Sequence, residues 1–348
     1  MRPIFCFAPG QSAQYVGMGS DLYDKFESAK SLYDKVKDIT GIDVARLSFN
    51  GPFDELTSTD NVQPILLAHS LACFRVFSDM YKEKTGDDFD FAATGGASLG
   101  EYFGVILAGV LGYEDTFRLV QKRGEFMKKY GSGRQALITL PPRDAQQVML
   151  DFNVELSNCN YSEQTVIGGL EDEIEKAIEF ARSQCSGPKK LRTMMLPTDA
   201  AFHTSLMADA QKHYAGEVDG CDFSVPSNYL FSNVTGLPYR KNGFDIRSNL
   251  TEQVTRPVQW QHMMNNVLTL LDIVAERYGG TPTIIEFGGG KPQKKQTDPA
   301  TQQGNFSGII FKNIAESGRK PNEDVRYLYC GGTGSISDTV RELTENEP

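Results

Sequence analysis

Short runs of apolar residues alternate along the chain with longer stretches in which apolar residues recur every three or four positions. The apolar runs predict buried strands at 4–8, 89–94, 229–232 and 283–287. The longer stretches predict helices, among them 61–84, 113–130, 245–253 and 258–278. Strands that alternate with helices indicate an α/β fold with a mainly parallel sheet covered on both faces.

The pattern changes near position 133. The periodicity there predicts a strand, a helix, two strands, a helix and a strand, at 136–140, 143–152, 154–159, 164–168, 171–183 and 191–196. This βαββαβ order is that of the ferredoxin-like split βαβ unit. We therefore expect a small ferredoxin-like subdomain over 133–197, inserted into a large α/β subdomain formed by 1–132 and 198–348.

The sharpest local signal is Gly96-Ala97-Ser98-Leu99-Gly100, where a predicted strand meets a predicted helix. This G-x-S-x-G spacing is typical of the nucleophile elbow of α/β-hydrolase-like cores. The two glycines relieve the crowding of a tight turn and leave the serine hydroxyl exposed. The backbone N–H of Leu99 and the helix dipole could then stabilise an oxyanion.

A serine nucleophile needs a base, and the chain has four histidines. We interpret His69, within an apolar helical run, as structural, and His213 and His262, in polar helices, as surface residues. His203 follows the last strand of the small subdomain, at a seam where an active-site cleft would open, and is the candidate base. Asp199 or a backbone carbonyl could orient its imidazole, and the latter arrangement would be a Ser–His dyad.

Composition excludes several other classes of function. The 348 residues carry a formal net charge of −10, which argues against a general nucleic-acid binder. No apolar run approaches the roughly 20 residues of a membrane span. Six cysteines without CxxC spacing argue against a metal site and favour free thiols in a reducing cytoplasm. Because no extended apolar stripe is left unassigned, we expect a monomer.

Several separated motifs occur together and in order between residues 4 and 291. They are APGQ with GMG at 8–19, QP at 63–64, GASLGE at 96–101, RG at 123–124, AFH at 201–203, FSNVTG at 231–236 and PVQW at 257–260. This set resembles the malonyl-CoA:acyl-carrier-protein transacylases and the acyltransferase domains of polyketide synthases, whose small subdomain is also ferredoxin-like. The resemblance implies transfer of a malonyl-type acyl group from coenzyme A to the phosphopantetheine thiol of an acyl carrier protein, through an acyl-serine.

The resemblance also implies catalytic roles for matched residues. Ser98 would be the acylated nucleophile, and His203 its general base and then general acid. The carbonyl of Gln253 would orient His203. The backbone N–H groups of Gln11 and Leu99 would form the oxyanion hole. No bound cofactor or metal is implied, since the coenzyme A thioester is a substrate.

For the acyl group, the resemblance implies that Arg123 pairs with the free carboxylate of a malonyl-type substrate. The remaining pocket residues would be Gln63, Ala97, Asn160 and Phe202. Ala97 stands where the family usually has a histidine. The pocket should therefore be larger and lack one donor, so the acyl group need not be plain malonyl, and the pathway, fatty-acid or polyketide, stays open.

Carrier proteins are generally acidic, so this net-acidic chain needs a local basic surface that binds the carrier protein. The first candidate is formed by Lys189, Lys190 and Arg192, at the last strand of the small subdomain. The second is formed by Lys291, Lys294 and Lys295.

Two other functions stay open. One is a thioester hydrolase of the same fold that clears wrongly loaded carrier proteins. Ala97 leaves that possibility open, whereas Arg123 speaks against hydrolysis of simple acyl chains. The other is a non-enzymatic carrier-docking protein with a relic site.

Overall fold

The computed structural model describes residues 1–140, 142–184, 191–240, 243–290 and 304–345. Its larger sheet has five strands in the order β7-β2-β1-β8-β9, and every neighbouring pair is parallel. The strands are β1 Ile4–Ala8, β2 Ala93–Gly96, β7 Tyr229–Leu230, β8 Thr283–Phe287 and β9 Arg326–Cys330. This arrangement confirms the expected α/β fold with a mainly parallel sheet.

Alternate side chains of β1 enter two different apolar cores. Ile4, Cys6 and Ala8 belong to a core on one face of the sheet, whereas Phe5 and Phe7 belong to a core on the other. Because both faces are covered, the strand is apolar throughout.

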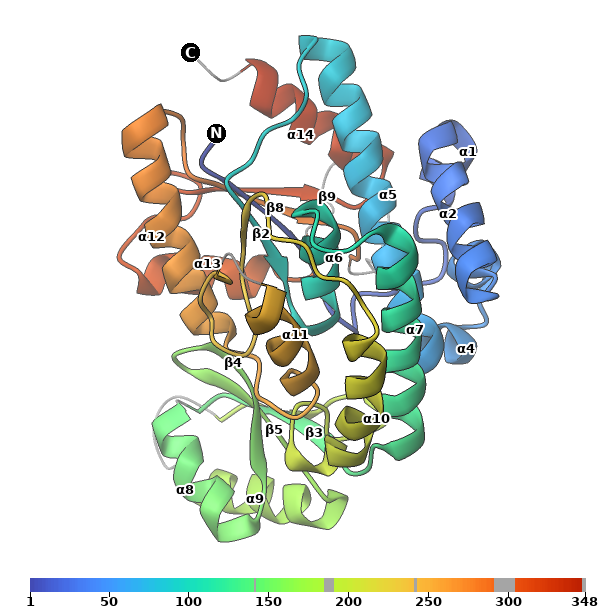
Figure 1. Cartoon of the computed structure of the whole chain (residues 1–348). Coiled ribbons are helices and arrows are strands. Elements are labelled where there is room, and N and C mark those ends of the chain that lie inside the picture. The colour runs from blue at the N-terminus through green and yellow to red at the C-terminus, as the bar shows by residue number, and fades with distance from the viewer. Residues whose placement is uncertain (141, 185–190, 241–242, 291–303, 346–348) are drawn as a thin grey trace.

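The helices that contribute to the first core are α1 Ser20–Lys25, α2 Glu27–Thr40, α3 Val44–Asn50, α4 Phe53–Thr57, α5 Thr59–Thr85, α6 Glu101–Leu107, α7 Tyr113–Tyr130, α10 Ala208–Asp219, α11 Gly243–Glu252 and α14 Thr333–Glu345. Those that contribute to the second are α12 Trp260–Tyr278 and α13 Ser307–Glu316. Two single 3-10 turns, Ser98–Gly100 and Ser205–Met207, precede α6 and α10. Figure 1 shows α12 and α13 on the opposite side of the sheet from α5 and α7.

A second sheet of four strands has the order β4-β5-β3-β6, with all neighbouring pairs antiparallel. Its elements follow the expected strand and helix order: β3 Arg134–Ile138, α8 Pro142–Phe152, β4 Glu155–Tyr161, β5 Gln164–Gly169, α9 Glu171–Gln184 and β6 Thr193–Met195. The helices pack on this sheet around a core of their own, and Figure 1 shows the unit in green below the large sheet. The two parts are joined where the N–H of Cys159 donates to the carbonyl of Val258, at 2.9 Å.

Some boundaries differ from those expected. The strand predicted at 89–94 begins only at Ala93, because Phe89 and Phe91 pack with Phe74 in an aromatic cluster instead of pairing in the sheet. Near the N-terminus, α1 and α2 are two separate helices, since Phe26 between them is extended.

The region beyond 291, to which the sequence assigned no element, contains α13, β9 and α14. Of these, α14 continues to Glu345. None of the helices in the described ranges is both long and apolar enough to cross a bilayer.

Candidate active site

The loop between β2 and α6 is a sharp turn whose geometry requires glycine at two positions. Ser98 has a φ of 53°, in the left-handed region that non-glycine residues seldom adopt. A Cβ at Gly96 would collide with the backbone of Gly100, and one at Gly100 with the carbonyl of Ala8. The G-x-S-x-G spacing thus has a direct steric cause in this chain.

Asn233 holds this turn in place from a distant segment. Its Oδ1 accepts from the backbone N–H of Ser98 at 2.6 Å, and its Nδ2 donates to the carbonyl of Gly96 at 2.7 Å. Both polar ends of one buried amide are therefore used to fix the strained serine.

The Ser98 hydroxyl and the His203 imidazole meet, although 105 residues separate them in the chain. The Oγ–Nε2 distance is 2.8 Å, and the opposite ring nitrogen, Nδ1, lies 2.6 Å from the carbonyl of Gln253. Since that carbonyl can only accept, Nδ1 carries the proton and Nε2 is free to accept from the serine hydroxyl. Burial, helped by the nearby Arg123 guanidinium, lowers the pKa of His203 to about 3, so the imidazole is neutral.

The loop that carries His203 is hydrogen-bonded to the small sheet and to the turn that follows α11 in the large part. The carbonyl of Phe202 accepts from Gln135 Nε2 at 3.1 Å and from Ser157 Oγ at 2.9 Å, both in the small sheet. The next N–H, that of His203, donates to the carbonyl of Val254 in the large part at 3.2 Å. The imidazole therefore lies where the two parts join.

Arg123, on α7, is only 1% exposed. Its Nη2 donates to Ser98 Oγ at 3.1 Å and to Gln253 Oε1 at 2.9 Å, and its Nη1 donates to Gln63 Oε1 at 2.7 Å. Its Nε has no hydrogen-bond partner, and no carboxylate in the described ranges forms an ion pair with it. A buried cation with neutral neighbours is costly to maintain. This arrangement suits an anionic ligand placed next to the serine hydroxyl.

The loop after β1 also lies against the serine. A Cβ added at Gly10 would lie 3.8 Å from the Cβ of Ser98, which brings the neighbouring Gln11 to the site. The side chain of Gln11 donates to the hydroxyl of Thr59 at 3.3 Å, and that hydroxyl donates to Asp199 Oδ2 at 2.8 Å. Asp199 thus bonds Thr59, and it is the Gln253 carbonyl that meets His203, so the carboxylate alternative for orienting the imidazole is wrong.

The other expected pocket residues are spread more widely. Ala97 and Phe202, which directly precede Ser98 and His203 in the sequence, are both buried. Asn160 lies in the small sheet, where its side chain donates to Gln164 at 2.9 Å and its carbonyl accepts from Asn313 at 3.0 Å. Its hydrogen bonds therefore do not reach the cluster around Ser98.

Sequence reasoning missed a buried carboxylate in the same cluster. Glu101, three residues after Ser98, is fully buried, and burial raises its pKa to about 7. Its Oε2 accepts from Gln253 Nε2 at 2.6 Å and from the N–H of Asn233 at 3.2 Å, and its Oε1 accepts from the hydroxyl of Tyr239. Glu101 is the last residue of the GASLGE motif, but nothing in the sequence distinguished it from an exposed acidic residue at the start of a helix.

The remaining histidines lie where they were expected. His69 is buried in α5, with its Nδ1 3.3 Å from the hydroxyl of Tyr33, and burial lowers its pKa to about 4. His213 and His262 are exposed, and His213 stacks on Tyr130 with ring centroids 4.3 Å apart. None of the three contributes to the cluster around Ser98.

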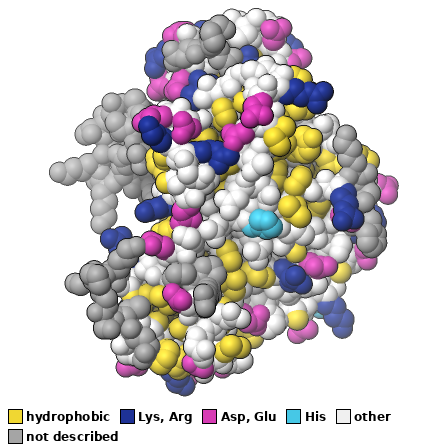
Figure 2. All heavy atoms as spheres, turned by 90° about the vertical axis from the view of Figure 1, so that its left-hand side faces the viewer, with side chains coloured by type: hydrophobic (Ala, Val, Ile, Leu, Met, Phe, Trp, Pro, Cys, Tyr) yellow, Lys and Arg dark blue, Asp and Glu magenta, His cyan; other side chains and the backbone are white. Residues whose placement is uncertain are grey.

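Of the expected carrier-docking residues, Lys189, Lys190, Lys291, Lys294 and Lys295 lie outside the described residues. Arg192 is exposed, and its backbone pairs with Thr139 beside β6. On the face shown in Figure 2, basic and acidic side chains are interspersed and do not gather by sign.

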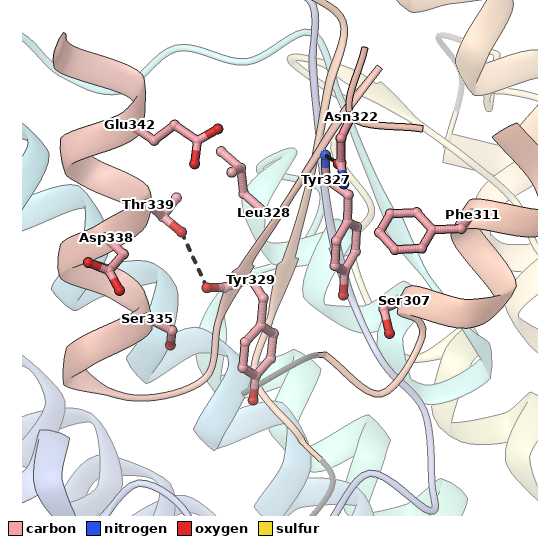
Figure 3. Close-up of a pocket in the computed structure, with 10 residues that line it drawn as sticks. All are labelled: Ser307, Phe311, Asn322, Tyr327, Leu328, Tyr329, Ser335, Asp338, Thr339 and Glu342. Carbon is pink, nitrogen blue, oxygen red and sulfur yellow. Dashed lines mark hydrogen bonds between the residues drawn. The ribbon is translucent and has the colours of Figure 1, made fainter. Parts of the chain in front are cut away.

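Two of the cavities elsewhere among the described residues offer no comparable chemistry. One, of about 260 Å³, lies between β9, α13 and α14, and Figure 3 shows it lined by Tyr327, Tyr329 and Glu342 among others. The other, of about 520 Å³, lies beside Asp21 and the loop that begins α14, where Asp21 accepts from the N–H of Thr333 at 2.7 Å. No group of three or more possible metal ligands occurs among the residues that the structure describes.

Comparison with known proteins agrees with this geometry. Residues 4–228 match the family described as acyl transferase domain. The malonyl CoA-acyl carrier protein transacylase of Bacillus subtilis is 34% identical over 300 residues, which cover 84% of this chain and 88% of that protein.

Among solved structures, the malonyl CoA-acyl carrier protein transacylase from Clostridium perfringens has a TM-score of 0.80 at 28% identity, covering 99% of this chain and 98% of that one. A malonyl-transacylase solved in complex with its type II polyketide synthase acyl carrier protein has a TM-score of 0.80 at 25% identity, covering 99% of each chain.

Proposed function

Since this chain belongs to the acyl transferase domain family, we propose that it moves a malonyl-type acyl group from coenzyme A to the phosphopantetheine thiol of an acyl carrier protein. The observation that carries the proposal is the position of Arg123. Its buried guanidinium donates to Ser98 Oγ and has no carboxylate partner among the described residues. An acyl group with a free carboxylate would supply that partner while its thioester carbon faces the serine.

In the first half-reaction, Ser98 Oγ attacks the thioester carbonyl while its proton passes to His203 Nε2, 2.8 Å away. The C–S bond breaks, and the coenzyme A sulfur leaves with the proton that His203 returns. The Nδ1 hydrogen bond to Gln253 keeps the imidazole in the required tautomer and stabilises the transient imidazolium.

The oxyanion of each tetrahedral intermediate would be held by the backbone N–H groups of Gln11 and Leu99. The closeness of Gly10 to Ser98, and the helical turn that begins at Ser98, support this assignment. One such donor is typically worth about 3 kcal/mol.

In the second half-reaction, the carrier thiol gives its proton to His203 and its sulfur attacks the acyl-serine carbonyl. The C–O bond to Ser98 breaks, and Ser98 Oγ recovers the proton. Water would give the free acid by the same route. A guanidinium that fixes the acyl carboxylate favours transfer by holding the acyl carbon for the incoming thiol.

The test is a single mixture of the protein, malonyl-CoA and a phosphopantetheinylated carrier protein, followed by mass spectrometry. Malonyl-carrier product, with label trapped on Ser98 in the absence of carrier, is the expected result. Free malonate in place of malonyl-carrier would identify a hydrolase. Absence of label on Ser98 would indicate a docking protein without catalysis. A Ser98→Ala variant is the matched control.

We further infer the two-subdomain division expected from the sequence, with boundaries at 133 and 197. The order β4-β5-β3-β6 and its antiparallel pairing support a ferredoxin-like small subdomain. The strand–turn–helix geometry around Ser98 supports a hydrolase-like large core.

The location and assembly of the protein are also proposals. Free thiols at all five described cysteines support a reducing cytoplasm. We propose a monomer, which light scattering of the purified protein would check.

A further inference from the structure

Glu101 is connected to the site through one side chain, that of Gln253. Oε1 of this amide accepts from Arg123 Nη2 at 2.9 Å, and its Nε2 donates to Glu101 Oε2 at 2.6 Å. The same Nε2 also donates to the carbonyl of Ser98 at 3.0 Å. A cation, an amide and a carboxylate therefore form one buried chain beside the nucleophile.

Only one orientation of the Gln253 amide suits both of its charged neighbours. Arg123 is purely a donor and needs the amide oxygen. Above pH 7, where Glu101 is ionised, its carboxylate is purely an acceptor and needs the amide nitrogen, as does the carbonyl of Ser98. A flipped amide would bring donor against donor and oxygen against oxygen. Because all three side chains are 1% exposed or less, water cannot compensate for the mismatch.

The amide orientation in turn fixes the guanidinium. Nη2 of Arg123 divides its donors between Gln253 and Ser98 Oγ, so a displaced Gln253 oxygen would let Nη2 move away from the acyl site. The main-chain carbonyl of Gln253, which holds His203, does not depend on which way the side-chain amide faces.

We propose that Glu101 is a positioning residue for acyl-group specificity: through the Gln253 amide it holds Arg123 in the orientation that accepts the free carboxylate of the acyl chain. This inference rests on the proposed transfer of a malonyl-type group. It concerns the choice between dicarboxylic and monocarboxylic acyl groups.

Glu101→Gln tests the proposal, because it keeps the shape and removes the charge that selects the amide orientation. Acylation of Ser98 is measured with malonyl-CoA and with acetyl-CoA. We expect the KM for malonyl-CoA to rise and the malonyl to acetyl ratio of kcat/KM to fall about tenfold, the effect of losing one charge-assisted hydrogen bond. The kcat/KM for acetyl-CoA should change less than that for malonyl-CoA.

Tyr239→Phe is the matched control, because Tyr239 donates to the other oxygen of Glu101 and the link to Gln253 keeps its own partners. It should lower the thermal unfolding midpoint and leave the malonyl to acetyl ratio unchanged. An equal fall of that ratio in Tyr239→Phe would show a merely structural role and overturn the proposal.

Gln253→Leu removes the side-chain link and keeps the carbonyl that meets His203. We expect the same fall in ratio, and no further fall in the double variant with Glu101→Gln. A normal ratio in folded Glu101→Gln overturns the proposal. If Glu101→Gln does not fold, Gln253→Leu decides. A normal malonyl to acetyl ratio in that variant would show that the Gln253 side chain does not link Glu101 to Arg123, and would overturn the proposal.

A readout without turnover separates this inference from the proposed function. In ¹⁵N spectra, the Arg123 guanidinium of the wild type should show slowly exchanging N–H signals that are lost in Glu101→Gln. Failure of the wild type to transfer any acyl group would overturn the proposed function alone. Unchanged Arg123 signals in Glu101→Gln would overturn the positioning role.

Discussion

Arg123 donates through Nη2 to the hydroxyl oxygen of Ser98 at 3.1 Å, and that oxygen lies 2.8 Å from the imidazole of His203. The nucleophile therefore has its base on one side and a fixed positive charge on the other. The guanidinium has no carboxylate partner among the described residues, so the acyl group itself is the natural counter-ion. This relationship gives the enzyme a means of choosing its substrate at the reacting atom.

Arg123→Ala should reverse the preference for malonyl-CoA over monocarboxylic acyl-CoAs. We expect kcat/KM for malonyl-CoA to fall roughly a hundredfold, which corresponds to a loss of about 3 kcal/mol of transition-state stabilisation, because a bidentate charge-assisted contact is lost. Monocarboxylic acyl-CoAs should be accepted better, since the cavity gains volume and loses a buried charge. Steady-state kinetics with the two donors checks this. Retained malonyl preference in the variant would exclude Arg123 as the carboxylate partner.

His203 should not produce an inflection near its ordinary pKa. Burial and Arg123 lower its pKa from 6.5 to about 3, so the free enzyme keeps a neutral base through mildly acidic pH. With acetyl-CoA as donor, kcat/KM for Ser98 acylation should be flat from pH 8 to about pH 5. A fall centred near pH 6.5 would show that the imidazole is more hydrated than this geometry implies. His203→Ala should reduce the rate by about 10² to 10⁴ at every pH.

Glu101 should make folding stability depend on pH in a defined direction. Burial raises its pKa from 4.5 to about 7, so between these values the folded protein holds a proton that the unfolded chain has released. The contribution of Glu101 to stability is full below about pH 4.5 and is lost as pH rises through 7. Relative to Glu101→Gln, the wild type should lose about 3 kcal/mol of unfolding free energy over this window. Denaturant unfolding of both proteins at several pH values measures the difference, in which the opposing effect of His203 cancels. A wild-type unfolding free energy that rises with pH relative to that of Glu101→Gln would contradict the raised pKa of Glu101.

The second glycine of the elbow, Gly100, should be intolerant of a methyl group. A Cβ at Gly100 would overlap the carbonyl of Ala8, so Gly100→Ala should cost about 1–3 kcal/mol or more and disturb Ser98 acylation. Gly216→Ala is the matched control, since no atom lies within 4 Å of its added Cβ and it lies inside α10. That change should stabilise the protein by about 0.5–1 kcal/mol. Thermal unfolding combined with acylation of Ser98 distinguishes the two.

The large elements were predictable because local patterns determine them. β1 is a continuous apolar run, and β8 is apolar except at Thr283 and Glu286. α7 has acidic residues in its first turn and lysines in its last. The bounds of all three were predicted correctly. β9 was missed because Arg326-Tyr327-Leu328-Tyr329-Cys330 mixes charge and hydroxyls, as suits a strand at the sheet edge.

The site was predictable only where residue type and spacing carry the chemistry. The elbow around Ser98 has such a pattern, and so does the AFH segment that ends at His203. Glu101 belongs to the same motif as Ser98, yet its burial was not predictable, because an acidic residue in the first turn of a helix is usually exposed and favoured by the helix dipole. Its burial results from Asn233, Tyr239 and Gln253, more than 130 residues later in the chain.

The separate anchoring of the neighbours Phe202 and His203 suggests a way to inhibit the enzyme. The carbonyl of Phe202 is anchored to the small sheet and the N–H of His203 to the large part, so the alignment of the base is transmitted through one short backbone step. A compound that wedges this junction apart would withdraw the base from the nucleophile without occupying the acyl site. Such an inhibitor would not be outcompeted by rising concentrations of thioester.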